Sequence, residues 1–173
     1  MTLQEYKTTV LPMKDKLFRF AYRMLNNRTE AEDVAQEILI KLWNKRTDLA
    51  EINNLEAWSI RLTKNLAIDK MRSKHRRTEE IKEGFDRVAG DISPDRAAET
   101  SDAVSRVRTL MNGLPEKQKN VMHLRDIEGL SYQEVSDALE MPLNQVKVYL
   151  YRARQKVREA LLAAENFGLD GAI

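Results

Sequence analysis

The sequence predicts an all-α fold with two small helical domains joined by an acidic linker. Apolar residues recur at helical spacing along most of the chain, whereas strand alternation and hairpin turns are missing. Large apolar residues then become rare near the middle, which is typical of a linker. At 173 residues, the chain is long enough for one domain or two small ones.

Two amphipathic helices are expected in the N-terminal half, at 17–25 and 29–44, and Thr29 and Glu32 fit a capping box at the start of the second. The apolar stripe of the second helix should face the core; it consists of Ala31, Val34, Ala35, Ile38, Leu39, Leu42 and Trp43. The opposite side carries Asp33, Gln36, Glu37, Ile40, Lys41 and Asn44. Ile40 on this polar side suits a protein-docking patch as well as it suits an ordinary exposed position.

A third helix should run from about residue 55 to 73, after a cap at Asn53 or Asn54. Three apolar residues point one way, and the first is expected in the core; they are Trp58, Leu62 and Leu66. Cationic and amide side chains fill other positions, namely Arg61, Lys64, Asn65, Lys70 and Arg72. This mixture suits contact with phosphates and unstacked bases.

The linker is expected at 78–97, a segment that includes two Gly and a Ser–Pro step. Residues 78–102 carry eight acidic side chains against three basic ones, whereas residues 61–77 carry seven Lys or Arg and one acid. The later helix-turn-helix segment is basic again. Two basic segments separated by an acidic one indicate two DNA-facing surfaces joined by a segment that avoids DNA.

The C-terminal half should contain helices at 103–111 and 115–128, followed by a helix-turn-helix at 131–158. The expected core of the first two helices consists of Val104, Val107, Leu110, Val121, Leu124 and Ile127. In the motif itself, Ser131 and Glu134 fit a capping box and Pro142 suits the first turn of the second helix. The turn between the helices often carries Gly in the left-handed conformation, and here Glu140 or Met141 must adopt it.

The second helix of this motif has a buried stripe formed by Val146, Leu150, Ala153 and Val157. Its opposite side carries Asn144, Lys147, Val148, Tyr151, Arg152 and Gln155. From Lys147 to Arg158 there are five basic residues and no acidic one. Such a helix can enter a major groove, and the alternative is a surface helix with a solvated charged face.

Several functional classes are not supported by the composition. The chain has no Cys, which excludes disulfides and thiolate zinc sites, and His75 and His123 have no second ligand at metal spacing. We expect both to be ordinary surface or partly packed residues. No phosphate-binding Gly loop and no nucleophile–base pair can be recognised, so we expect neither a cofactor nor an enzyme. No apolar run has membrane-spanning length and no secretory segment is present, which predicts a soluble, cytoplasmic protein.

Two stretches resemble bacterial sigma factors of the extracytoplasmic-function group. AEDVAQEILIKLW (31–43) and EAWSIRLTKNLAIDKMRSKHRR (56–77) resemble the second region of these proteins. LPEKQKNVMHLRDIEGLSYQEVSDALEMPLNQVKVYLYRARQKVREAL (114–161) resembles the fourth region. The resemblance covers roughly residues 6–77 and 98–162, and the order of the stretches, the acidic segment between them and the short chain all fit this group. It implies a region-two domain at 1–77, a linker at 78–97 and a region-four domain at 98–173.

The resemblance also implies roles for particular residues. Core RNA polymerase would be bound by Asp33, Gln36, Glu37, Ile40 and Lys41. The minus-ten promoter element would be read and melted by Arg61, Lys64, Asn65, Lys70 and Arg72, with Asn65 near the pocket for a flipped-out base. The minus-thirty-five element would be read by Asn144, Gln145, Lys147, Val148, Tyr151 and Arg152. An anti-sigma factor is a further expected partner.

The recognition helix departs from the commoner family pattern. Val148 and Tyr149 stand where Ser and Arg are frequent, and Asn144–Gln145 replaces a Gly–Thr pair. The family's base preference therefore does not carry over to this chain. Two other functions also remain open from the residues alone. One is a stand-alone helix-turn-helix regulator, which would need a dimerisation surface and a symmetric site. The other is a helical protein-interaction adaptor whose basic patches only increase solubility.

Overall fold

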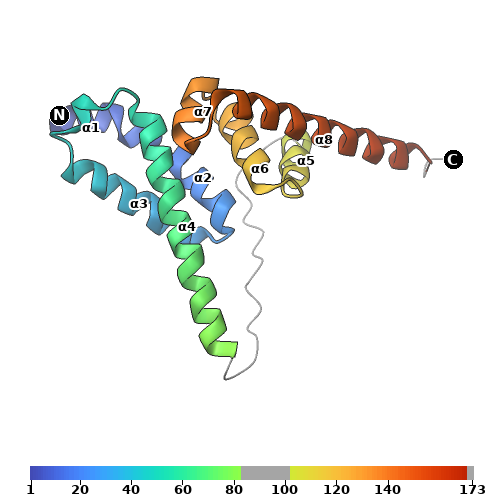
Figure 1. Cartoon of the computed structure of the whole chain (residues 1–173), viewed down its shortest axis with the longest axis horizontal. Helices are drawn as coiled ribbons and strands as arrows, with labels where there is room; N and C mark the ends of the chain where they lie inside the picture. Colours follow the sequence, from blue (N-terminus) through green and yellow to red (C-terminus); the bar gives the residue numbers. More distant parts are fainter. Residues whose placement is uncertain (83–101, 171–173) are drawn as a thin grey trace.

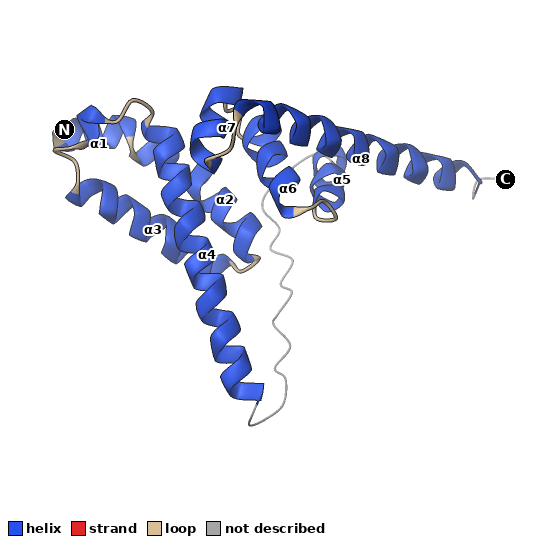
Figure 2. Cartoon of the chain, viewed as in Figure 1, coloured by secondary structure: helices blue, strands red, loops and turns tan. Residues whose placement is uncertain are grey.

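The computed structural model describes residues 1–82 and 102–170, and its regular structure there is helical without a strand, as predicted (Figures 1 and 2). The N-terminal half contains α1 (Leu3–Thr9), η1 (Leu11–Met13), α2 (Lys14–Leu25), α3 (Arg28–Asn44), η2 (Leu49–Glu51) and α4 (Leu55–Lys82). The C-terminal half contains α5 (Asp102–Met111), α6 (Glu116–Met122), η3 (His123–Ile127), α7 (Tyr132–Leu139) and α8 (Leu143–Asp170). Within these ranges, no helix is long and apolar enough to cross a membrane.

The core of the N-terminal half lies where α2 packs between α3 and α4. α2 contributes Leu17 and Phe20, and α3 contributes Val34, Ile38 and Leu42, all of which are fully or almost fully buried. Removing each of these large apolar side chains from water stabilises the fold by about 1.5–3 kcal/mol. The stripe predicted for α3 therefore faces the core, with Leu39 and Trp43 half-buried at its edge.

α1 was not predicted from the sequence, and it is held against α3 by a single aromatic residue. The Tyr6 hydroxyl donates a hydrogen bond to the carbonyl oxygen of Leu39 at 2.7 Å. The Tyr6 ring also meets the Trp43 ring edge-on, with the two centroids 5.1 Å apart. These contacts hold α1 against the C-terminal part of α3.

α3 begins earlier than the sequence suggested. The Asn27 side chain accepts a hydrogen bond from the backbone N–H of Glu30 at 3.0 Å and is the N-cap. The expected capping box of Thr29 and Glu32 is therefore wrong, because both residues already lie inside the helix. Glu32 instead pairs with Arg28, one turn before it, at 3.0 Å.

α4 differs from the expectation in its length and in its buried side. Asn54 caps it, as one of the two predicted residues, by accepting from the N–H of Ala57 at 2.9 Å. The helix continues to Lys82, well beyond residue 73. Its most buried side is built from small residues and one Ile, namely Ala57, Ser59, Ile60, Thr63 and Ala67. Trp58, Leu62 and Leu66 are only half-buried and pack against the edge of the core.

In the C-terminal half, α8 packs against α5, α6 and α7. Val121, Leu124, Val135 and Val146 are fully buried there. The expectation for Val104 is wrong, because 40% of this residue on α5 is exposed. α8 is a single helix of 28 residues that extends away from the packed helices towards the C-terminus (Figure 1).

The N-cap of α3 gives a direct test of this local structure. Asn27→Ala should lower the free energy of unfolding by about 1 kcal/mol, because the N–H of Glu30 loses its side-chain acceptor. Thr29→Ala is the matched control and should change stability by less than about 0.5 kcal/mol. Urea unfolding followed by circular dichroism measures both. A larger loss for Thr29→Ala than for Asn27→Ala would place the cap two residues later.

Candidate nucleic-acid and protein interfaces

The α8 face consists of Asn144, Gln145, Lys147, Val148, Tyr151 and Arg152. All six residues are exposed, with 45% of Val148 and 69% of Tyr151 accessible. They lie opposite Val146, Leu150, Ala153 and Val157, which are buried against the neighbouring helices. The structure therefore brings together the whole set predicted from the sequence on one open helix surface.

The turn before α8 has the geometry of a helix-turn-helix. Ser131 caps α7 and forms a reciprocal capping box with Glu134, as predicted. Glu140 ends α7 in the left-handed conformation, with φ 54°, so Glu140 rather than Met141 takes the position that usually holds Gly. The Ser136 hydroxyl closes the turn by donating to the carbonyl oxygen of Met141 at 2.6 Å.

A shallow groove of about 470 Å³ runs beside the α8 face. It is lined by Tyr132, Lys147, Leu150, Tyr151, Arg154, Gln155 and Arg158. Three of these side chains are cationic and none is acidic, which suits a phosphate backbone. Arg154 already makes a two-pronged ion pair with Asp126, at 2.9 and 2.5 Å. Arg158 was not among the predicted site residues, although its spacing of one heptad plus one turn from Lys147 could have indicated it.

The α3 face consists of Asp33, Gln36, Glu37, Ile40 and Lys41. Its side chains lie away from the core on the outer side of α3, and 59% of Ile40 is exposed. Glu37 is half-buried and pairs with Lys41 one turn later at 3.1 Å. An exposed Ile surrounded by polar and charged groups is the arrangement expected of a protein contact rather than of a nucleic-acid contact.

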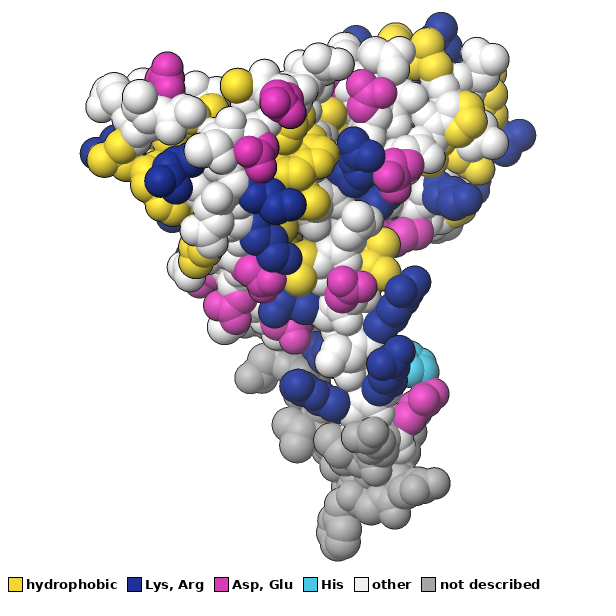
Figure 3. All heavy atoms as spheres, turned by 60° about the vertical axis from the view of Figure 1, so that its left-hand side comes forward, with side chains coloured by type: hydrophobic (Ala, Val, Ile, Leu, Met, Phe, Trp, Pro, Cys, Tyr) yellow, Lys and Arg dark blue, Asp and Glu magenta, His cyan; other side chains and the backbone are white. Residues whose placement is uncertain are grey.

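The α4 face consists of Arg61, Lys64, Asn65, Lys70 and Arg72. Helical spacing places four of these residues on one side of α4, but Lys70 lies about half a turn away from Arg61. Asn65 and Arg72 are exposed, whereas Arg61 and Lys64 are half-buried. Further Lys and Arg side chains follow on the projecting part of α4, where the space-filling view shows dark-blue side chains gathered below the two halves (Figure 3).

Arg61 and Lys64 are half-buried because they contact the C-terminal half. The Arg61 guanidinium donates to Glu140 at 3.1 Å. The Lys64 ammonium lies 3.9 Å from the other carboxylate oxygen of Glu140 and donates to the carbonyl oxygen of Leu139 at 3.3 Å. Burial lowers the pKa of Lys64, and the Glu140 carboxylate partly offsets this effect. The sequence predicted Arg61 and Lys64 as site residues but did not indicate their contacts with Leu139 and Glu140.

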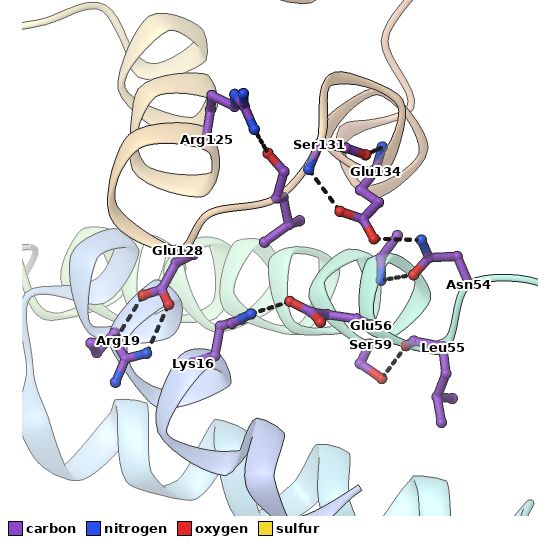
Figure 4. Close-up of polar contacts among 12 residues, drawn as sticks. Lys16, Arg19, Asn54, Leu55, Glu56, Ser59, Arg125, Glu128, Ser131 and Glu134 are labelled. Carbon is purple, nitrogen blue, oxygen red and sulfur yellow. Dashed lines mark hydrogen bonds and ion pairs between the residues drawn. The ribbon is translucent and has the colours of Figure 1, made fainter. Parts of the chain in front are cut away.

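Further polar contacts join the halves along α2 and at the start of α4 (Figure 4). Arg19 forms a two-pronged ion pair with Glu128, with N–O distances of 2.8 and 2.7 Å. Arg23 contacts Asn120 and lies 3.5 Å from Glu116. The Asn54 amide donates to Glu134 at 3.2 Å. α4 and α7 pack against each other between these contacts.

His123 lies within this junction and is not the surface or partly packed residue expected from the sequence. Only 5% of it is exposed, and its ring centroid is 5.8 Å from that of Phe20 in α2. Its Nε2 is 3.3 Å from Glu128. Burial lowers the pKa of His123, so the ring is neutral near pH 7, and Arg19 is the charged partner of Glu128.

Among the acidic residues of the junction, Glu128 has the pKa that is shifted furthest from its ordinary value. Burial alone would raise its pKa, since only 2% of the side chain is exposed. The hydrogen bonds and the charge of Arg19, together with the nearby His123 ring, outweigh burial and lower the pKa from about 4.5 to about 2. The carboxylate is therefore fully ionised at neutral pH, and the junction depends on that charge.

Comparison with known proteins gives two family matches. Residues 10–77 match the model of sigma-70 region 2, and residues 105–157 match the model of sigma-70 region 4. The chain is 32% identical to the ECF RNA polymerase sigma factor SigW of Bacillus subtilis, over 86% of this chain and 84% of SigW. It is 34% identical to the ECF RNA polymerase sigma factor SigE of Mycolicibacterium smegmatis, over 85% of this chain, and it spans 58% of the length of SigE.

Solved structures share the fold. The sigma factor RpoE of Bartonella quintana, determined in complex with the anti-sigma factor NepR, matches with a TM-score of 0.75 and 24% identity over 92% of this chain and 98% of RpoE. CnrH, determined with the cytosolic domain of CnrY, matches with a TM-score of 0.66 and 22% identity over 94% of this chain and 90% of CnrH.

The lowered pKa of Glu128 predicts an acid-sensitive junction. A carboxylate whose pKa is lower in the folded chain stabilises it above about pH 4.5, and this contribution is lost as the pH falls towards about 2. Glu128→Gln should therefore be less stable than the parent at pH 7 and lose less stability over that acidic window. Asp126→Asn is the control, since Asp126 pairs with Arg154 inside the C-terminal half. Thermal unfolding from pH 7 to pH 3 measures this, and parallel curves for parent and Glu128→Gln would contradict it.

Proposed function

Because the chain belongs to the extracytoplasmic-function family of RNA polymerase sigma factors, which direct promoter-specific initiation, we propose that it divides this function among the α3, α4 and α8 faces. The α3 face binds core polymerase, the α4 face acts on the minus-ten element, and the α8 face reads the minus-thirty-five element. The observation that carries this division is the occurrence of two different polar helix faces in region 2 together with a complete helix-turn-helix in region 4. A stand-alone regulator with one helix-turn-helix would not need the two polar helix faces of region 2.

Docking on polymerase is assigned to the α3 face because of its chemistry. An exposed Ile40 supplies apolar area, and Asp33 and Gln36 beside it supply hydrogen-bonding groups on the same open surface. Protein interfaces commonly combine a small apolar centre with a polar rim. This face carries two acidic groups and one cation, so it is poorly suited to nucleic acid.

Promoter recognition is assigned to the other two faces. On the α4 face, Arg61 and Lys64 bind phosphates of the DNA strand. The exposed Asn65 amide offers donors and an acceptor to an unpaired base. On the α8 face, Lys147 and Arg152 flank Val148 and Tyr151, and Arg158 adds a phosphate contact in the groove alongside. Lys70 has a lesser role, because it lies on another side of α4.

The remaining assignments follow from family membership. The domains are proposed at 1–77 and 98–173, with the acidic segment 78–97 between them. α4 covers the first five residues of that segment, and residues 83–97 lie outside the described residues. The chain acts in the cytoplasm, needs no cofactor, and carries out no covalent chemistry. RpoE was solved with an anti-sigma factor, and we propose that such a factor also controls this chain.

Polymerase docking is tested with the α3 face. Run-off transcription with core polymerase and the full chain should give defined start sites that core polymerase alone does not give. Changing both Asp33 and Gln36 to Ala should weaken core binding by about 2 kcal/mol or more, as expected for residues at the centre of an interface. Glu51→Ala removes an exposed acid outside α3 and should bind as the parent does. Unaltered core affinity of the double variant in a pull-down titration would refute the docking assignment.

Promoter melting is tested with Asn65. Asn65→Ala should leave core binding intact and slow open-complex formation, because an extruded base loses its amide partner. A template with a pre-melted bubble should restore much of the activity, since the cost of unpairing has already been met. Permanganate reactivity of thymines in the minus-ten element measures opening on duplex and bubble templates. Equal reactivity of variant and parent on the duplex would mean that Asn65 does not contact a base.

A further inference from the structure

The junction between the two halves has one electrostatic polarity. In the ion pairs that cross it among the described residues, the N-terminal half supplies Arg or Lys and the C-terminal half supplies Glu. The cations are Arg19, Arg23, Arg61 and Lys64, and the acids are Glu116, Glu128 and Glu140. A basic surface of region 2 thus lies against an acidic surface of region 4, in a protein whose region 2 must act on DNA.

The C-terminal end of α7 meets the α4 face as a phosphate group would. The two carboxylate oxygens of Glu140 lie near Arg61 and Lys64 separately, at 3.1 and 3.9 Å. The carbonyl oxygen of Leu139, which accepts from Lys64, belongs to the negative end of the α7 helix. One anionic group therefore neutralises two neighbouring cations, as a phosphate bound at this place would do.

The junction closes only one of the three functional surfaces. On the α4 face it takes up Arg61 and Lys64, so a DNA strand reaching these cations must first displace Glu140. The α3 face keeps Asp33, Gln36, Ile40 and Lys41 exposed. The α8 face keeps all six of its residues exposed. Polymerase and upstream DNA can therefore bind the chain while the junction is closed, whereas the melted strand cannot reach Arg61 and Lys64.

From these contacts we propose that the junction is an autoinhibitory latch in which the end of α7, with Glu140, occupies the single-strand path of α4 in place of DNA phosphate. The latch is held by Arg19 and Glu128, outside the path, and must open before the minus-ten strand binds. This inference rests on the proposed function of the α4 face. Because the closed form cannot bind the strand, the apparent affinity for single-stranded DNA is reduced by the fraction of molecules that are open.

The decisive variant is Arg19→Gln, which weakens the latch without touching the α4 face. It removes a cation, so simple electrostatics predicts weaker binding to DNA, whereas release of the latch predicts tighter binding. Arg19 is partly exposed, with 43% of its side chain accessible, so α2 should fold without the charge. Glu140→Gln is the second variant, and Glu159→Gln is its control, because it removes an exposed acid of α8 whose described partner is Gln155.

Two measurements on the full chain without polymerase test the latch. The first is fluorescence anisotropy with a labelled single strand of mixed sequence. Arg19→Gln and Glu140→Gln should each bind about three- to ten-fold more tightly than the parent, and Glu159→Gln within about two-fold of it. The second is energy transfer between dyes on cysteines introduced at Lys7 and Arg106, which the cysteine-free chain makes specific. Transfer should fall in both latch variants and in the parent as salt is raised, because salt screens the junction.

The outcomes separate the latch from the proposed function. Unchanged transfer in Arg19→Gln, or an affinity for the single strand that is unchanged or lower, overturns the latch even if transcription depends on the chain. If Glu159→Gln tightens binding as much as Glu140→Gln, the effect is only net charge and the latch is again overturned. Failure of the chain to direct core polymerase would instead overturn the proposed function, since neither measurement above includes polymerase.

Discussion

The arrangement of the two halves depends on the ion pair between Arg19 and Glu128, whose carboxylate is almost completely buried. Its position comes from η3, a π-helical turn in which the N–H of Glu128 donates to the carbonyl oxygen of His123 at 3.0 Å. Gly129 follows with φ 76°, a conformation that glycine adopts without strain. This local irregularity directs one carboxylate towards α2, and an unpaired charge in its place would be costly. α7 then follows, so that Glu134 contacts Asn54 at the start of α4 and Glu140, which ends α7, contacts Arg61.

Local patterns in the sequence predicted the helices well where short-range chemistry determines them. The helix-turn-helix and its Ser131 cap follow from neighbouring residues, and the same residues limit the left-handed position to Glu140 or Met141, of which Glu140 adopts it. The cap of α3 was misplaced because Thr29 and Asn27 both suit the position, and only the backbone conformation distinguishes them. α1 was missed because seven residues give too short a pattern, and its position depends on Tyr6 reaching α3. Val104 fits the helical stripe of α5, yet none of the described elements covers it, and 40% of the residue is exposed.

The candidate surfaces show a similar limit. The α8 and α3 faces could be predicted because a regular buried stripe determines what lies on the opposite side of a helix. The surroundings of Arg61 and Lys64 could not, since Leu139 and Glu140 are more than seventy residues away in the sequence. Glu116, Glu128 and Glu140 look like ordinary surface acids in a chain with nearly balanced charge. Likewise, nothing near His123 in the sequence indicates that Phe20 covers it. Contacts between domains produce no periodic pattern in the sequence from which they could be predicted.

The length of α8 has a mechanical consequence. Its 28 residues correspond to roughly 40 Å of uninterrupted helix, and the helix continues beyond residue 157, where the match to region 4 ends. The inner end carries the side chains assigned to promoter reading, while among the described elements no helix is drawn against the last turns of α8 (Figure 1). A straight helix behaves as a stiff lever, so a force on the outer turns acts with a long arm on the inner end. A molecule that binds this outer end can therefore change the orientation of the α8 face without contacting it.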